Sequence, residues 1–243
     1  MSARKSPRHV GLLSHMLAES AVFRDLADRA STLRVQAEVE PLSEYLWLST
    51  KSQQNAALNS KFIQGLKYGN LDPVDFGAYM VQDSVFCYYS KESIDVAYAK
   101  ATDPNLKNFL EHKSESYKTY YEGLFKTWCI RDPNGIDLNK ACADYAALEN
   151  NVSKTMVSLY LVVALIPCLK LWPWLGQEIY KIPHHFGVYE SWVQANLDPT
   201  YDGYKKLEQI IDDAFLVGEI DKEQALFVYQ GCMSGEANFF SSV

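Results

Sequence analysis

The chain has 243 residues, of which 48% are hydrophobic and 22% are charged, and its formal net charge is -7 at pH 7. This composition is ordinary for a globular protein and excludes a chain that is disordered throughout. The negative charge argues against a dedicated nucleic-acid binder, because such proteins need a cationic face to meet phosphates. A small molecule or another protein is therefore the expected partner.

Residues 1–42 are interpreted as an N-terminal extension, possessing some helical pattern, ahead of a single helical domain at 43–243. The first residues are basic and serine-rich, but no continuous apolar core follows them, so a secretory signal is not predicted. A cytoplasmic protein is expected, and an organelle transit peptide is the alternative. Three acidic residues weaken that alternative: Glu19, Asp25 and Asp28.

The predicted fold is all-α, because no short β-branched runs alternate with turn pairs. Glycine and proline fall mainly between long periodic stretches. Two Asp-Pro pairs, Asp72–Pro73 and Asp103–Pro104, are typical of helix starts. The seven or eight predicted helices span residues 43–67, 74–101, 104–129, 137–150, 152–181, 189–195, 201–216 and 221–240.

The most apolar stretch, Met156 to Leu175, contains a single charge, Lys170. Its twenty residues are long enough to cross a membrane. Pro167 and Pro173 argue against a span, and a helix buried all round in a helical domain has the same composition. A buried core helix is the favoured interpretation, and no membrane association is expected.

The five cysteines are widely spaced and include no Cys-x-x-Cys pair, so neither a disulfide framework nor a zinc site is predicted. Cys168 differs from the others because it follows Pro167 within the apolar stretch. A proline inside a helix kinks or breaks it, and a fresh helix start beside the sulfur would favour the reactive thiolate. The alternative is an inert buried cysteine.

Two carboxylates share helix faces with aromatic rings. Asp83 lies three residues before Phe86 on a largely apolar face, so it needs a partner, which is either a ligand or a basic residue on a neighbouring helix. Glu236 shares its face with Phe239 and Phe240. Desolvation there would raise its pKa and suit a general acid or base, whereas the alternative is an exposed glutamate near a fraying terminus.

No metal or organic cofactor is predicted. His184 and His185 are adjacent, so they would not face each other on a helix, and a turn is expected there. His112 lies between two glutamates, but no second Glu/His cluster completes a di-iron site. No glycine-rich phosphate loop is present.

An ordered set of motifs between Asn59 and Phe240 resembles the TenA (thiaminase II) family. These motifs are Phe62-Ile-Gln-Gly-Leu, the run from Gly69 to Ser84, Ala164-Leu-Ile-Pro-Cys, Tyr189-Glu-Ser-Trp and Glu236-x-x-Phe239-Phe240. The resemblance implies a heme-oxygenase-like helical bundle, an aminopyrimidine or thiamin-derived substrate in thiamin salvage, and a homo-oligomer, either dimer or tetramer.

The resemblance also implies roles for particular residues. Cys168 matches the family's nucleophile and Glu236 its acid/base. Asp83 matches the aspartate that holds the aminopyrimidine edge, and Tyr145 matches a tyrosine that helps orient the cysteine. Phe239 is expected in the pocket wall.

Three positions depart from the family pattern. Phe86 and Asn196 stand where tyrosines are common, and Trp172-Pro173 follows the cysteine where an unbroken helix is usual. Trp172 could supply a replacement stacking surface, and Pro173 is expected to bend the helix. These departures favour two alternatives to the enzyme: an inactive relative that binds a flat heterocycle, and a partner-binding protein with a vestigial pocket.

Overall fold

A computed structural model describes residues 40–181 and 183–243. The extension predicted at residues 1–42 lies outside the described part except for its last three residues. Leu42–Val243 is one compact unit. Within the described ranges the chain forms ten α-helices and two short 3-10 turns but no strand, which confirms the all-α prediction.

The ten helices vary in length from seven to 28 residues. Their bounds are α2 Leu42–Leu48, α3 Lys51–Leu58, α4 Lys61–Lys67, α5 Pro73–Lys100, α6 Pro104–Thr127, α7 Lys140–Thr155, α8 Leu159–Tyr180, α9 Glu190–Asn196, α10 Lys205–Leu216 and α11 Lys222–Phe240.

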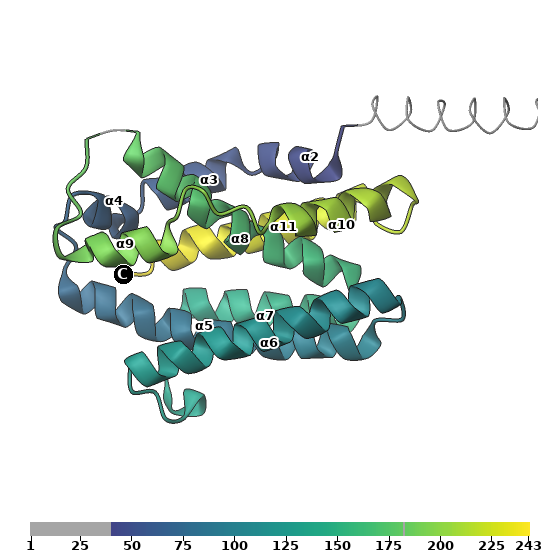
Figure 1. Cartoon of the computed structure of the whole chain (residues 1–243), viewed down its shortest axis with the longest axis horizontal. Helices are drawn as coiled ribbons and strands as arrows, with labels where there is room; N and C mark the ends of the chain where they lie inside the picture. Colours follow the sequence, from purple (N-terminus) through teal and green to yellow (C-terminus); the bar gives the residue numbers. More distant parts are fainter. Residues whose placement is uncertain (1–39, 182) are drawn as a thin grey trace, which may run out of the picture. The chain divides into compact units, whose positions relative to one another are not determined.

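Helix α5 packs along α6 on one side and α7 on the other, as Figure 1 shows. Helix α11 packs against α7, α8 and α3, while α10 packs against α8 and α2. Helix α7 contacts both α5 and α11. It therefore joins the group formed by α5 and α6 to the group formed by α8, α10 and α11. The inner faces of α5, α6, α7, α8 and α11 surround the cavity described below.

The two Asp-Pro helix starts are confirmed. The Asp72 carboxylate accepts from Val74 N at 2.8 Å, and Pro73 is the first residue of α5. The Asp103 carboxylate accepts from Leu106 N at 2.7 Å at the start of α6. Each side chain satisfies an amide that has no partner within the helix, and each proline occupies a position where no amide is needed.

The single helix predicted for residues 43–67 is wrong, because three short helices occupy this stretch. The first ends where the Thr50 hydroxyl donates to the carbonyls of Leu46 and Trp47, at 3.2 and 3.0 Å. Ser60 begins the third by accepting from Ile63 N at 3.2 Å. Serine and threonine hydroxyls compete with helix continuation in this way.

The boundary predicted near Asn150 is also wrong, since α7 continues to Thr155. The chain leaves the helix at Met156, and the Ser158 hydroxyl then donates to Ala97 O of α5 at 2.7 Å. A tertiary contact thus sets this break. Helix α10 begins at Lys205, later than the predicted residue 201.

Helix α8 is long and apolar enough to cross a membrane, but 67% of its most apolar window is buried inside the protein. It is one continuous helix that contains both Pro167 and Pro173. The break expected before Cys168 is therefore absent. Each proline still lacks an N–H, so the carbonyls of Val163 and Leu169 lose the donor that would lie four residues later.

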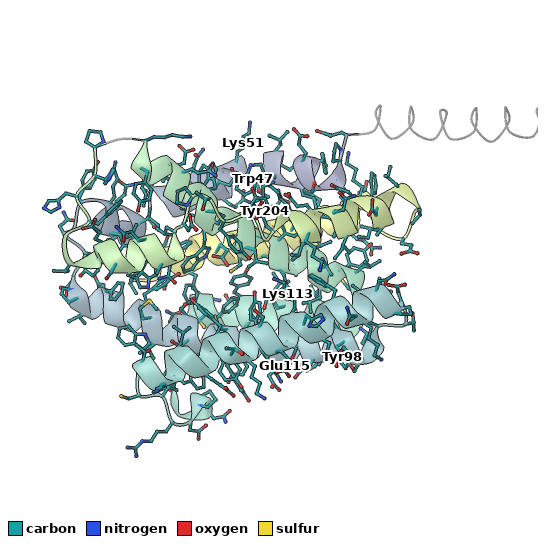
Figure 2. The ribbon with its side chains drawn as sticks, viewed as in Figure 1. Trp47, Lys51, Tyr98, Lys113, Glu115 and Tyr204 are labelled. Atoms are coloured by element: carbon teal, nitrogen blue, oxygen red, sulfur yellow. The ribbon has the colours of Figure 1, made fainter. Side chains whose placement is uncertain are left out.

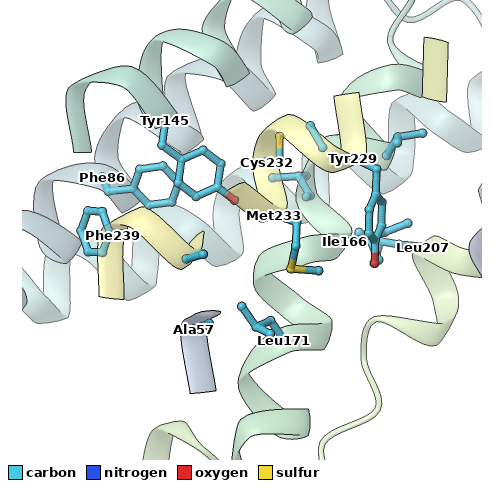
Figure 3. Close-up of a cluster of buried hydrophobic side chains, with 14 of the residues drawn as sticks. Ala57, Phe86, Tyr145, Ile166, Leu171, Leu207, Tyr229, Cys232, Met233 and Phe239 are labelled. Carbon is cyan, nitrogen blue, oxygen red and sulfur yellow. The ribbon is translucent and has the colours of Figure 1, made fainter. Parts of the chain in front are cut away.

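Apolar side chains from both groups of helices form one core, part of which is drawn in Figure 3. Met233 and Tyr229 of α11 are fully buried there, as are Ile166 and Leu171 of α8. The core thereby fixes α8 and α11, the helices that carry Cys168 and Glu236.

Candidate active site

A cavity of about 380 Å³ lies among the helices, and all eight residues predicted for the site line it. This volume suits a small organic molecule. The predicted lining residues are Asp83, Phe86, Tyr145, Cys168, Trp172, Asn196, Glu236 and Phe239. The structure therefore brings together residues up to 156 positions apart in the chain, while their chemical roles remain predictions.

Asp83 is a buried carboxylate with no hydrogen bond or ion pair to any other residue in the described part of the chain. Its exposed fraction is 7%. Burial raises its pKa to about 7, and the charge of Glu236 adds to the rise. A desolvated carboxylate without a protein donor costs free energy, and a ligand that donates to it would recover that cost.

Glu236 is buried and lines the cavity from α11. Its Oε2 accepts a hydrogen bond from Trp172 Nε1 at 3.2 Å. Burial raises its pKa to about 7, and hydrogen bonding with Trp172, Tyr145 and Cys168 opposes the rise. A carboxyl that titrates near neutral pH can both accept and donate a proton, as acid–base catalysis requires.

Cys168 projects from α8 into the cavity and is half-buried. Burial raises the pKa of its thiol well above the ordinary value, and the charges of Glu236, Cys87 and Asp83 add to that rise. The expected helix start that would favour thiolate is wrong, because α8 is unbroken at Pro167. In the ligand-free protein the sulfur is a neutral thiol beside Glu236.

Three aromatic residues, Phe86, Tyr145 and Phe239, line the cavity. Figure 3 shows these side chains within the buried cluster. Phe86 stacks on Tyr145 with ring centroids 4.4 Å apart, and Phe239 lies 5.9 Å from Phe86. The Tyr145 hydroxyl makes no hydrogen bond of normal geometry among the described residues, yet it lies close enough to Glu236 to lower that group's pKa. A flat ring ligand suits this group of rings.

Asn196 lines the cavity and is the last residue of α9. Its Oδ1 accepts from the Tyr120 hydroxyl at 3.4 Å, and its Nδ2 donates to Trp192 O at 2.8 Å. The position where the family commonly has a tyrosine is thus tied to α6 through Tyr120. The long distance to Tyr120 makes this a weak contact.

A third buried carboxylate, Glu149 of α7, is 1% exposed and is not among the residues that line the cavity. The Ser90 hydroxyl donates to its Oε2 at 2.5 Å. Burial raises the pKa of Glu149 to about 8, the hydrogen bond opposes the rise and the charge of Glu236 adds to it. Burial therefore favours the protonated form of Glu149 near neutral pH, which reduces the charge repulsion on Glu236.

Two groups of histidines were considered from the sequence, His184 with His185 and His112. Residues 183–186 form a loop before the 3-10 turn Gly187–Tyr189, as expected for His184 and His185. His112 is on α6. Within residues 40–181 and 183–243, no three His, Cys, Asp or Glu side chains are grouped so that they could hold a metal ion.

Several cavity residues were not predicted from the sequence: Tyr79, Cys87, Lys113, Ser116, Tyr117, Tyr120 and Tyr201. A signal for some of them was present. Lys113, Ser116, Tyr117 and Tyr120 follow the three-and-four spacing of one helix face. Their polar character made this face resemble an ordinary solvated one.

No family model matches the chain. In sequence it is similar to the "Bifunctional TH2 protein, mitochondrial" of Arabidopsis thaliana, with 21% identity over 227 residues. The match covers 83% of this chain and 37% of the plant protein, so the chain spans well under half the length of that relative.

Solved structures with the same fold include a TenA family transcription regulator from Silicibacter sp. TM1040, at TM-score 0.69 and 16% identity, covering 83% of this chain and 95% of that one. A TenA homologue from P. horikoshii OT3 matches at TM-score 0.69 and 17% identity, covering 83% and 97%. A Sulfolobus solfataricus protein proposed to be a TenA-like thiaminase matches at 0.62 and 20%, covering 84% and 95%. At these identities the matches show the fold.

Proposed function

We propose that this chain, which has the all-helical fold of TenA proteins, is a hydrolase that cleaves the exocyclic C–N bond of an aminopyrimidine derived from thiamin. The observation that carries the proposal is the convergence of Cys168, Glu236 and Asp83 on one cavity. A thiol nucleophile, a carboxyl that titrates near neutral pH and a carboxylate for the ring are the groups that this reaction needs.

The first step joins the Cys168 sulfur to a ring carbon of the pyrimidine. The thiol is protonated at rest, so ionised Glu236 takes its proton as the sulfur attacks. Glu236 then gives that proton to the departing amine as the exocyclic C–N bond breaks. In the second step Glu236 accepts a proton from water, whose oxygen bonds to the exocyclic carbon. The C–S bond then breaks with its electron pair on sulfur, and Glu236 returns its proton to Cys168, which restores the resting thiol. The products are the pyrimidine alcohol and ammonia or another amine.

Asp83 would hold the substrate while these bonds change. An ionised carboxylate can accept hydrogen bonds from a protonated ring nitrogen and from the adjacent amino group, and such charge-assisted pairs are strong. Phe86 and Tyr145 would stack on the ring. Binding of a cationic ring would lower the raised pKa of Asp83, because it supplies the opposite charge that the empty cavity lacks.

Turnover tests the proposal. The wild type is incubated with aminomethyl-aminopyrimidine and with thiamin while ammonia and the pyrimidine alcohol are measured. The matched variants are Cys168→Ala and Cys129→Ala, since Cys129 is exposed and lies outside the cavity. We expect the wild type and Cys129→Ala to turn over the substrate and Cys168→Ala to have lost this activity. Turnover unchanged in Cys168→Ala contradicts the proposed nucleophile.

An alternative function, binding of a flat heterocycle without catalysis, is favoured by one observation: burial, with a smaller contribution from nearby acids, raises the pKa of the Cys168 thiol and favours its protonated form. The same experiment separates the two functions. Tight binding of the pyrimidine alcohol by a wild type that releases no product would support the binding protein.

A further inference from the structure

The cavity has a donor-rich wall on α6 that the proposed reaction does not use. Lys113, Ser116 and Tyr117 line the cavity from this helix, and we call them the α6 donor group. Their spacing of three and four residues places them on one helix face. Figure 2 shows Lys113 on the side of α6 that faces α8.

No residue in the described ranges occupies these donors. Lys113 makes no ion pair, and neither the Ser116 hydroxyl nor the Tyr117 hydroxyl has a hydrogen-bond partner there. Lys113 is nevertheless half-buried. A partly desolvated ammonium without an acid is costly, so the free protein leaves a cation available at the cavity wall.

Burial and a neighbouring cation both act on the charge of Lys113. Burial lowers the pKa of Lys113, a thiolate at Cys168 would oppose that effect, and the like charge of Lys206 lowers the pKa further. Lys206 therefore places a second cation nearby, on α10. Asp198, an acid that also lines the cavity, is already hydrogen-bonded by Thr200 N and its hydroxyl at 2.9 and 2.7 Å.

We propose that the α6 donor group binds an anionic substituent on the substrate, such as a phosphate ester or a carboxylate. The substrate is then a heteroaromatic base that carries an anionic arm. Its basic ring lies against Asp83 and its arm against Lys113. The identity of the ring in this inference rests on the proposed function. The anionic substituent is inferred only from the α6 donor group.

Calorimetry on the whole protein tests this inference without turnover. The probes are the pyrimidine alcohol, its phosphate monoester and a carboxymethyl analogue. We expect the wild type to bind at least one anionic probe about tenfold to a hundredfold more tightly than the alcohol, because charge-assisted hydrogen bonds contribute that much. Comparing the phosphate with the carboxylate identifies the arm.

The matched variants are Lys113→Met, Lys113→Arg and Lys118→Met, which removes an exposed lysine of the same helix outside the cavity. Lys113→Met should lose the preference for the anion, Lys113→Arg should keep much of it, and Lys118→Met should keep all of it. Equal affinity of the wild type for all three probes overturns the inference, as does a preference that survives in Lys113→Met. Hydrolysis of the substrate without an anionic arm by the wild type is a separate readout, so the proposed function can stand when this inference fails.

Discussion

The indole N–H of Trp172 donates to Glu236 Oε2 at 3.2 Å, joining α8 to α11 across the cavity. Trp172 lies one helical turn after Cys168 on α8. The position that departs from the family pattern therefore contacts the proposed acid/base directly, and the identity of this side chain should affect the chemistry.

Replacing Trp172 by phenylalanine should move the acidic limb of the pH–rate profile upward. The indole donates to the ionised carboxylate and so lowers the pKa of Glu236. Losing that donor raises the pKa, so the base form is populated only at higher pH, by about one pH unit. The measurement is kcat/KM for the aminopyrimidine against pH. Trp174→Phe is the control because Trp174 packs on Trp47 outside the cavity, and an equal shift in both variants would contradict the assignment.

Cys168 should react slowly with iodoacetamide at neutral pH in the ligand-free protein. Burial and nearby acids raise the pKa of its thiol, and the thiolate is the reactive form. Exposed Cys129 should be alkylated first. Mass spectrometry of peptides over time measures both rates. Faster labelling of Cys168 would mean that the cavity stabilises the thiolate.

The free energy of unfolding should fall as pH rises from about 5 to about 9, and Glu149→Gln should reduce the fall. Burial raises the folded-state pKa of Glu149 to about 8, so the folded state holds its proton where the unfolded chain has lost it. Stability from this group is full below the unfolded pKa and is lost as pH rises through the folded pKa, by on the order of a few kcal/mol.

Urea denaturation of both proteins at several pH values measures this effect. The difference in stability should grow with pH in favour of Glu149→Gln, whose side chain can still accept from Ser90. Glu111→Gln on the exposed face of α6 is the control. A constant difference across the pH range would show that Glu149 is not held protonated.

Gly176→Ala should destabilise the protein, whereas Gly123→Ala should stabilise it. A Cβ at Gly176 would lie 1.9 Å from the backbone oxygen of Leu197, and the two chain segments would have to separate. We expect a loss of about 3 kcal/mol. Gly123 lies in α6 with no atom near its Cβ position, so alanine should add about 0.5 to 1 kcal/mol. Thermal unfolding of both variants measures the contrast.

Helix identity was largely predictable because local chemistry determines it. The pairs Asp72–Pro73 and Asp103–Pro104 carry a cap and a fixed φ angle in adjacent residues. The three-helix arrangement of residues 43–67 was missed because the Thr50 hydroxyl competes with helix continuation without changing the apolar periodicity. The end of α7 was missed because Ser158 bonds to Ala97, a partner 61 residues away.

The candidate site was predictable only in part. Motif resemblance singled out Cys168, Asp83 and Glu236, and the fold brings their side chains to one cavity. Lys113 carries no motif, and its half-buried position on α6 depends on how α6 packs against α5. The protonated state of Cys168 was also beyond sequence reasoning, since it results from burial and from acids on other helices.

Pro173 leaves a main-chain carbonyl oxygen of α8 without its helical hydrogen-bond donor. Leu169 lines the cavity, and its carbonyl oxygen has no amide donor at residue 173 because proline lacks one. Altering the Leu169 side chain would leave this backbone acceptor without its helical donor. A residue other than proline at position 173 would supply the amide that engages it within the helix.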